Sequence, residues 1–141
     1  MAELRPRSML DAGAGSGILA IAAVKLGVTE VSGFDCDPVA VERCGANAEL
    51  NGLAKGRIRF RRQDVREWKP DGKADVVCAN ILSSVLLEAA GTLWRATGKR
   101  LILSGIRESE GTAVARAFEA LGARVVRREG DGEWCGLVLD K

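Results

Sequence analysis

Met9-Leu-Asp-Ala-Gly-Ala-Gly-Ser-Gly17 is the segment from which the architecture of this chain can be worked out. It places a short apolar strand directly before a turn that contains three glycines, and Ile18-Leu-Ala-Ile-Ala-Ala-Val24 then begins a helix. Gly13, Gly15 and Gly17 carry no Cβ atom, so the backbone can turn tightly and approach a ligand closely. This strand–turn–helix unit predicts a binding site for a nucleoside cofactor.

The spacing of the glycines narrows the kind of cofactor. A dinucleotide fingerprint requires glycine at its first, third and sixth positions, but the sixth position counted from Gly13 is Ile18. A phosphate-binding P-loop would end in Gly-Lys-Ser or Gly-Lys-Thr, and neither follows Gly17. The sequence therefore disfavours both nicotinamide dinucleotides and nucleoside triphosphates.

A second signal follows the turn, in Glu30-Val-Ser-Gly-Phe-Asp-Cys-Asp-Pro38. Asp35 ends a predicted strand here, and an acidic residue about 20 positions after such a turn accepts hydrogen bonds from both ribose hydroxyls. An Asp at a strand end is by itself more often a turn or cap residue, but the distance from the glycine turn favours the ribose role. Cys36 lies between two loop aspartates and is expected to border the adenine.

The rest of the chain alternates strands and helices, which predicts a parallel sheet. Asp37 before Pro38 is typical of a helix N-cap, and Gly52 is the matching C-terminal stop. Helices are also predicted over Leu82–Trp94 and Ala113–Leu121. Only Glu129-Gly-Asp-Gly132 joins the last two strands, so they should form an antiparallel hairpin. The predicted strands cover residues 7–12, 30–35, 57–62, 74–79, 99–105, 122–129 and 133–139.

Several of these segments carry a family resemblance. Class I S-adenosylmethionine-dependent methyltransferases resemble this chain in Asp11-x-Gly13-x-Gly15-Ser-Gly17, Gly33-x-Asp35-x-Asp37-Pro38 and Asn47-x-x-x-Asn51-Gly52. The bacterial ribosomal protein L11 methyltransferase family resembles it more particularly, in Ala79-Asn-Ile-Leu82, Leu101-Ile-Leu-Ser-Gly-Ile106 and Glu133-Trp-Cys-Gly-Leu-Val-Leu139. The resemblance covers nearly the whole chain. It implies an α/β fold, the seven-stranded, Rossmann-like class I methyltransferase sheet, mostly parallel with an antiparallel C-terminal hairpin.

The same resemblance implies the cofactor and most of its site. The cofactor would be S-adenosylmethionine, held in part by Asp11 and by the three glycines of the turn. Asp64 follows the third predicted strand and would accept a hydrogen bond from the adenine amine, while the Val65 backbone amide could bind the ring. The alternative is that Gln63-Asp64 forms a simple turn, but its place after a strand end favours the adenine role.

Asn80 is the predicted catalytic residue, and it would also border the cofactor. It follows the buried strand Val76-Val-Cys-Ala79, so its carboxamide should lie between cofactor and acceptor and could orient an amine. A related motif, Asn-Pro-Pro-Tyr, resembles the signature of methyltransferases that act on glutamine or adenine amides. In this chain Ile81 and Leu82 stand at the two proline positions, which favours an amino group as the acceptor. The alternative role for Asn80 is the N-cap of the next helix.

The sequence also limits the chemistry. It contains no histidine, so a nucleophilic cysteine would lack its usual base. Alignment of the reacting groups can supply much of the catalysis of methyl transfer, which makes a site without histidine acceptable. The four cysteines lack the paired spacing of zinc ligands and are predicted to be reduced thiols, so no metal is expected.

Charge and composition suggest no polyanionic or membrane partner. The net charge is +2, and hydrophobic residues make up 47% of the chain and charged residues 28%. Direct nucleic-acid binding is therefore not expected, and no run is long enough to cross a membrane. Arginines cluster in two predicted strands, and we interpret both as solvated edge strands rather than a basic face near RNA-bound protein. These arginines are Arg57, Arg59, Arg61 and Arg62, and Arg124, Arg127 and Arg128.

Length and the N-terminus complete the expectations. Residues 1–141 have the size of one S-adenosylmethionine-binding domain, and without an apolar leader the chain is expected to be cytoplasmic. By the resemblance, the acceptor would be an amine on a ribosomal protein, although the family's N-terminal recruiting domain is not in this sequence. The alternatives are a small-molecule N-methyltransferase and a non-catalytic cofactor-binding module, and the sequence does not determine the oligomeric state.

Overall fold

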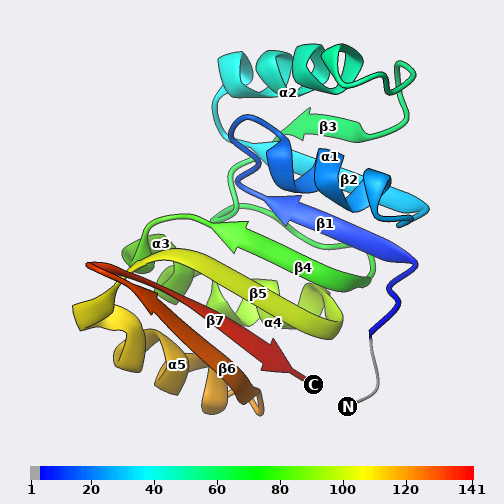
Figure 1. Ribbon diagram of the computed structural model, residues 1–141. Helices are drawn as coiled ribbons and strands as arrows, with labels where there is room; N and C mark the ends of the chain where they lie inside the picture. Colours follow the sequence, from blue (N-terminus) through cyan, green and yellow to red (C-terminus); the bar gives the residue numbers. More distant parts are fainter. Residues whose placement is uncertain (1–3) are drawn as a thin grey trace.

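The computed structural model describes residues 4–141, and within them one sheet holds seven strands in the order β3-β2-β1-β4-β5-β7-β6 (Figure 1). The first five strands pair in parallel, whereas β7 is antiparallel to both β5 and β6. This is the predicted class I methyltransferase topology. The strands are β1 (Ser8–Ala12), β2 (Glu30–Asp35), β3 (Arg59–Arg62), β4 (Ala74–Asn80), β5 (Thr97–Arg107), β6 (Arg124–Asp131) and β7 (Trp134–Asp140).

Helices pack on both faces of this sheet, and each face has its own apolar core. One core joins Met9, Val31 and Val76 to the first two helices, and the other joins Val77 and Leu101 to the later ones. Val76 and Val77 are neighbours in β4, and they enter opposite cores because side chains alternate along a strand. The helices are α1 (Ile18–Lys25), α2 (Pro38–Leu50), α3 (Ser83–Glu88), α4 (Ala90–Ala96), the 3₁₀ turn η1 (Glu108–Glu110) and α5 (Gly111–Glu119).

The predicted ends of α2 are confirmed. The Asp37 side chain accepts a hydrogen bond from the Val39 amide at 2.9 Å, and Pro38 occupies the first helical position. Gly52 follows the helix with a φ of 80°, and its amide donates to the Glu49 carbonyl. A cap aspartate and a left-handed glycine therefore fix both ends of this helix.

The prediction of one helix over Leu82–Trp94 is wrong, because the chain bends at Ala89 into α3 and α4. Ala89 has φ −95° and ψ 6°, outside the helical region, and it belongs to the ends of both helices. Leu86 and Leu93 nevertheless pack in the same core. The apolar periodicity therefore continues across the bend, and it could not reveal the break.

Some strand boundaries also differ from prediction. β3 begins at Arg59 rather than at residue 57, because the Arg57 amide instead closes a turn by donating to the Ala54 carbonyl. β5 runs over Thr97–Arg107, longer than predicted, since it pairs with β4 on one side and β7 on the other. These differences depend on pairing partners rather than on local pattern.

Both arginine-rich strands lie at the edges of the sheet, as the edge interpretation predicted. β3 pairs only with β2, and β6 pairs only with β7, so each has one unpaired side. Most of their arginines are exposed to solvent. No helix between residues 4 and 141 is long and apolar enough to span a bilayer.

Candidate functional site

The glycine turn lies at the carboxyl end of β1, where ligands bind in sheets of this kind. All three glycines have positive φ angles, of 78° at Gly13, 59° at Gly15 and 83° at Gly17. The Gly13 and Ala14 amides both donate to the Phe34 carbonyl at 2.9 Å, which ties the turn to the end of β2. The predicted strand–turn–helix unit is therefore present, and its backbone has the conformation that glycine tolerates.

Asp35 joins the turn to the loop after β2. One of its carboxylate oxygens accepts a hydrogen bond from the Gly15 amide at 2.9 Å, and the other accepts from the Asp37 amide at 3.0 Å. The side chain is half-buried, so part of the carboxylate faces solvent. Each oxygen can accept a second hydrogen bond, and Asp35 can therefore hold two further hydroxyl donors.

Helix α2 supports the turn from the side. The Asn47 carboxamide donates to the Ser16 carbonyl at 2.9 Å, and the Cys44 thiol donates to the Gly15 carbonyl at 3.2 Å. Gly17 packs tightly against this helix, because a Cβ there would lie only 3.2 Å from Cys44 Cβ. The sequence pattern does not predict that Asn47 and Cys44 support the turn, because each of these two hydrogen bonds joins residues about 30 positions apart.

The structure buries Asp11 beneath the turn, with an exposure of 1%. Both of its carboxylate oxygens are without a hydrogen-bond partner among residues 4–141. Burial, together with the nearby Asp35 carboxylate, raises the pKa of Asp11 to about 7. Asp11 is therefore close to the predicted site but does not line its surface.

The predicted adenine-side residues come together in a hollow of about 400 Å³. Cys36 and Asp64 both line it, although they lie on different loops. The Arg62 guanidinium donates to the Cys36 carbonyl at 3.1 Å, which holds the two loops in place. The Val65 side chain is buried in the core, so only its backbone could serve a ligand.

Asp64 also forms a turn, as the alternative interpretation of Gln63-Asp64 predicted. Its carboxylate accepts from the Arg66 amide at 2.9 Å, and its carbonyl accepts from the Glu67 amide at 3.1 Å. The side chain is 38% exposed. Because a carboxylate has spare acceptor positions, the turn and a ligand contact are compatible.

Asn80 ends β4 and is exposed to solvent. It is not the cap of the next helix, the alternative role, because the N-cap of α3 is Leu82, whose side chain has no oxygen to accept a hydrogen bond from the helix amides. The Asn80 carboxamide fills the space beside Gly105, because a Cβ on this glycine would lie only 2.3 Å from the Asn80 Oδ1 atom. Asn80 is thus free to use its carboxamide in the site.

Gly105 is a residue that the sequence analysis missed. It has a φ of 74° and lies where the pairing of β5 with β7 shifts, between Leu103 and Ile106. An isolated glycine in a strand is typical of a bulge or a close approach, and that signal could have identified it. The glycine turn packs against Ile81, the residue after Asn80, because a Cβ on Gly13 would lie only 2.4 Å from Ile81 Cγ2.

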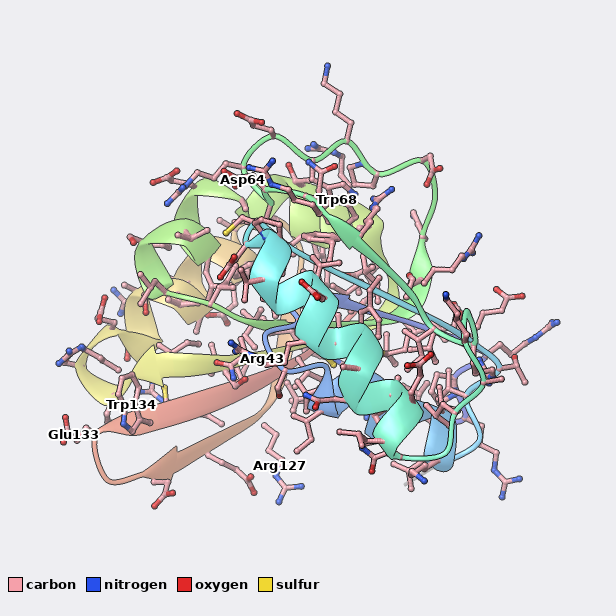
Figure 2. All side chains as sticks on the ribbon, turned by 90° about the horizontal axis from the view of Figure 1, so that it is seen from above. Arg43, Asp64, Trp68, Arg127, Glu133 and Trp134 are labelled. Atoms are coloured by element: carbon pink, nitrogen blue, oxygen red, sulfur yellow. The ribbon has the colours of Figure 1, made fainter. Side chains whose placement is uncertain are left out.

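A second hollow, of about 580 Å³, opens beside Gly105. Glu129, Asp131 and Trp134 of the β6–β7 hairpin line it, and Trp134 is 47% exposed. Figure 2 shows Trp134 at the hairpin tip, well apart from Asp64, so the two hollows are separate. The turn and Asn80 lie at the carboxyl ends of β1 and β4, the same edge of the sheet as both hollows.

The site offers neither a metal centre nor a reactive buried thiol. In the part of the chain that the structure describes, no three His, Cys, Asp or Glu side chains are grouped to hold a metal. Cys36 is exposed, and the other three cysteines are buried and free. Burial raises the pKa of Cys44 to about 11 and that of Cys78 to about 12, so both thiols stay protonated at neutral pH.

Comparisons with known proteins agree with this geometry. The family model described as ribosomal protein L11 methyltransferase (PrmA) matches residues 1–141. The ribosomal protein L11 methyltransferase of Pelotomaculum thermopropionicum is 42% identical in an alignment of 135 residues, and the match covers 93% of this chain and 42% of that protein. That of Geobacter sulfurreducens is 43% identical in an alignment of 136 residues, and the match covers 95% of this chain and 44% of that protein.

A solved structure is similar over almost the whole chain. The ribosomal protein L11 methylase of Lactobacillus delbrueckii subsp. bulgaricus is 31% identical, with a TM-score of 0.89, and the match covers 98% of this chain and 71% of that one. The chain thus spans less than half the length of the two curated relatives named above.

Proposed function

This chain belongs to the ribosomal protein L11 methyltransferase (PrmA) family, and from that premise we propose that it transfers a methyl group from S-adenosylmethionine to an amine nitrogen. The acceptor that we propose is an amine of a ribosomal protein, the substrate class in the relatives' names. The observation that carries the proposal is the hydrogen bond between Gly15 and Asp35, which joins the glycine turn to a carboxylate with acceptor positions to spare.

The residues present fit S-adenosylmethionine. Asp35 has room for the two ribose hydroxyls, and the hollow lined by Cys36 and Asp64 offers an acceptor for the adenine amine. A Cβ on Gly15 would meet no atom within 4 Å, so the turn is open at its middle. The two carboxylates Asp11 and Asp35 near the turn disfavour a phosphate-bearing nucleotide and favour a ligand with positive charge.

When bound, the cofactor supplies an electrophilic methyl group on a sulfonium. The protein must align the acceptor nitrogen with that group, and alignment alone can be worth about 7–11 kcal/mol of barrier. The exposed Asn80 carboxamide can accept a hydrogen bond from an amine N–H and so orient its lone pair. Since the chain has no histidine, we expect solvent to take the amine's proton before transfer.

The hollow beside Gly105 supports an amine as the acceptor. Asp131 places a carboxylate on its wall, whereas the Glu129 carboxylate pairs with Arg127 and the Arg107 guanidinium lies 5.6 Å from the centroid of the Trp134 ring. The Asp131 carboxylate attracts an ammonium group, the form in which an alkyl amine arrives at neutral pH. Gly105 lines this hollow and also lies against the Asn80 carboxamide, so an amine held in the hollow would be near the proposed catalytic side chain.

Calorimetric titration of the chain with S-adenosylhomocysteine tests the cofactor site. We expect binding by the wild-type chain, and at least about tenfold weaker binding by Asp35→Ala, because hydrogen bonds to a charged group are worth about 1.5–3 kcal/mol. Asp37→Ala is the matched control, since this aspartate caps α2 and should leave the affinity within about twofold. A folded wild-type chain that binds no cofactor would contradict the proposal.

Transfer of labelled methyl groups tests the reaction. We expect label on a ribosomal protein that has free amines, and none on the same protein after its amines have been exhaustively methylated by chemical means. Label on small amines but not on the protein would instead favour the small-molecule alternative. Cofactor binding without any transfer would favour the non-catalytic module.

A further inference from the structure

The proposed function does not explain why Asp11 is buried without a hydrogen-bond partner among residues 4–141. Among residues 4–141, the buried polar or charged residues are Asp11, Ser83 and Thr97, and only Asp11 can ionise. Its two oxygens are also the only buried side-chain nitrogen or oxygen atoms in that part of the chain without a hydrogen-bond partner. A carboxylate buried in this way is strongly unfavourable unless a positive group faces it.

Among residues 4–141, the elements around Asp11 bring no such group. From β2, Asp35 faces Asp11 with a second negative charge, and from α2 and β4 the ionisable groups that interact with Asp11 are the thiols of Cys44 and Cys78. Arg43 of α2 acts on Cys44 but not on Asp11. From β3 the ring of Phe60 fills the space beside Gly17 and Gly33, and the only basic residue in α1, Lys25, lies in its last turn.

The ionisation of Asp11 follows from these surroundings. Burial, with the Asp35 carboxylate, raises its pKa to about 7, so near neutral pH the protein holds a proton there for about half of the time. A positive charge arriving within about 4–6 Å would favour the ionised form again. The glycine turn above Asp11 is where the proposed cofactor, with its sulfonium and ammonium groups, would bring positive charge.

We infer that Asp11 makes cofactor binding proton-linked and selective for positive charge: when the cofactor binds, Asp11 ionises and its proton passes to the solvent buffer. The inference rests on the proposed function, because it requires S-adenosylmethionine in this site. S-Adenosylhomocysteine lacks the sulfonium charge, so it should displace less of the proton. The preference for S-adenosylmethionine over S-adenosylhomocysteine should therefore grow as the carboxylate ionises.

Calorimetry in two buffers measures the proton directly. Titrations with S-adenosylmethionine at pH 7, in phosphate and in Tris, should differ in heat because the two buffers take up the released proton with different enthalpies. We expect the wild-type chain to release about half a proton more than Asp11→Asn, given a pKa near 7. The comparison between the two chains cancels any proton that the ligand's own amine exchanges.

The control variant is Asp37→Asn, which changes an exposed loop aspartate two residues from Asp35 and should keep the release. Wild-type binding with equal proton exchange in Asp11→Asn would overturn the inference while leaving the proposed function intact. A folded wild-type chain without binding would instead remove the proposed function itself. If Asp11→Asn does not fold, the carbon-13 shift of the Asp11 carboxyl in the wild-type chain, followed against pH with and without cofactor, should show a lower pKa with cofactor, and an unchanged pKa would overturn the inference.

Discussion

At the scale of single residues, three polar side chains of the site differ in how they are satisfied. Asp35 accepts two backbone hydrogen bonds and keeps a half-exposed carboxylate, whereas Asp11 is buried and accepts none from residues 4–141. Asn80 is exposed and leaves the capping position of α3 to Leu82. Solvent exposure and hydrogen bonding therefore distinguish Asp35 from Asp11, although both are aspartates, and they fit the different roles that we propose for the three side chains.

Asn80→Ala should slow methyl transfer without loosening the fold. We expect turnover to fall by about 100-fold, because a poorly aligned amine loses the advantage of orientation. Stability should stay within about 0.5 kcal/mol of the wild type, as for surface substitutions in general. Steady-state kinetics and urea denaturation give both numbers. Asn51→Ala, which loses a hydrogen bond to the Asn47 carbonyl, is the matched control, and its turnover should be unchanged.

Asp11→Asn should change how stability depends on pH. The pKa of Asp11 is raised in the folded chain to about 7 from an ordinary value of 3.8. The folded state therefore holds a proton that the unfolded state has lost, and stability falls as pH rises from about 4 to about 7. The full effect is on the order of 4 kcal/mol.

Asparagine does not titrate, so the variant should lack this loss and should be more stable than the wild type at pH 8. Urea midpoints at pH 4.5, 6 and 8 measure the difference between the two chains without cofactor. Parallel curves for the wild type and the variant over this range would contradict the prediction.

At the scale of secondary-structure elements, the unit of β1, glycine turn and α1 is held mainly by its neighbours. The N-cap of α1 is Gly17, which provides no side-chain hydrogen bond. Backbone bonds to Phe34 and Asp35, with side-chain bonds from α2, fix the turn instead. An eight-residue helix is marginal alone, so its position depends on these contacts and on core packing.

Gly13→Ala and Gly15→Ala should separate packing from ligand access. Both place a side chain at positive φ, which costs about 1–2 kcal/mol. Only the alanine at Gly13 also meets Ile81, so Gly13→Ala should be the less stable variant by urea denaturation, and Ile81→Ala should partly restore it. At Gly15 the new methyl group points into open space, so the main loss should be in S-adenosylhomocysteine affinity. Equal stability of the two variants would contradict the assigned contact.

At the scale of the whole molecule, the end of the chain completes the sheet. β7 lies between β5 and β6, so the last strand in sequence joins an edge strand to the rest. The Arg100 guanidinium donates to both carboxylate oxygens of Asp140, at 2.6 and 2.9 Å. This hydrogen bonding lowers the pKa of Asp140, so the pair contributes stability at neutral pH that is lost as the pH falls through that lowered value.

Leu139→Ala should therefore destabilise the whole sheet. Leu139 of β7 is fully buried, and removing such a side chain costs about 2–5 kcal/mol. Val126→Ala on the edge strand β6 is the control, because this side chain is 43% exposed and should cost less than about 1 kcal/mol. Urea denaturation followed by circular dichroism measures both. Similar losses in the two variants would show that β7 is not part of the cooperative core.

The sequence by itself determined the features that depend on neighbouring residues. The order of strands and helices, the glycine turn, the Asp37 cap and the edge arginines could all be predicted, because side-chain alternation and backbone angles act over a few positions. The bend at Ala89 could not, since the apolar pattern is the same on both sides of it.

Only the tertiary structure decided which distant groups meet. It placed Gly105 against Asn80, brought Cys36 and Asp64 to one hollow, and buried Asp11 without a hydrogen-bond partner in the described part of the chain. Each of these depends on strand pairing and packing between segments far apart in the chain. Such contacts are fixed by the register of the sheet and the fit of the core, which no local pattern encodes.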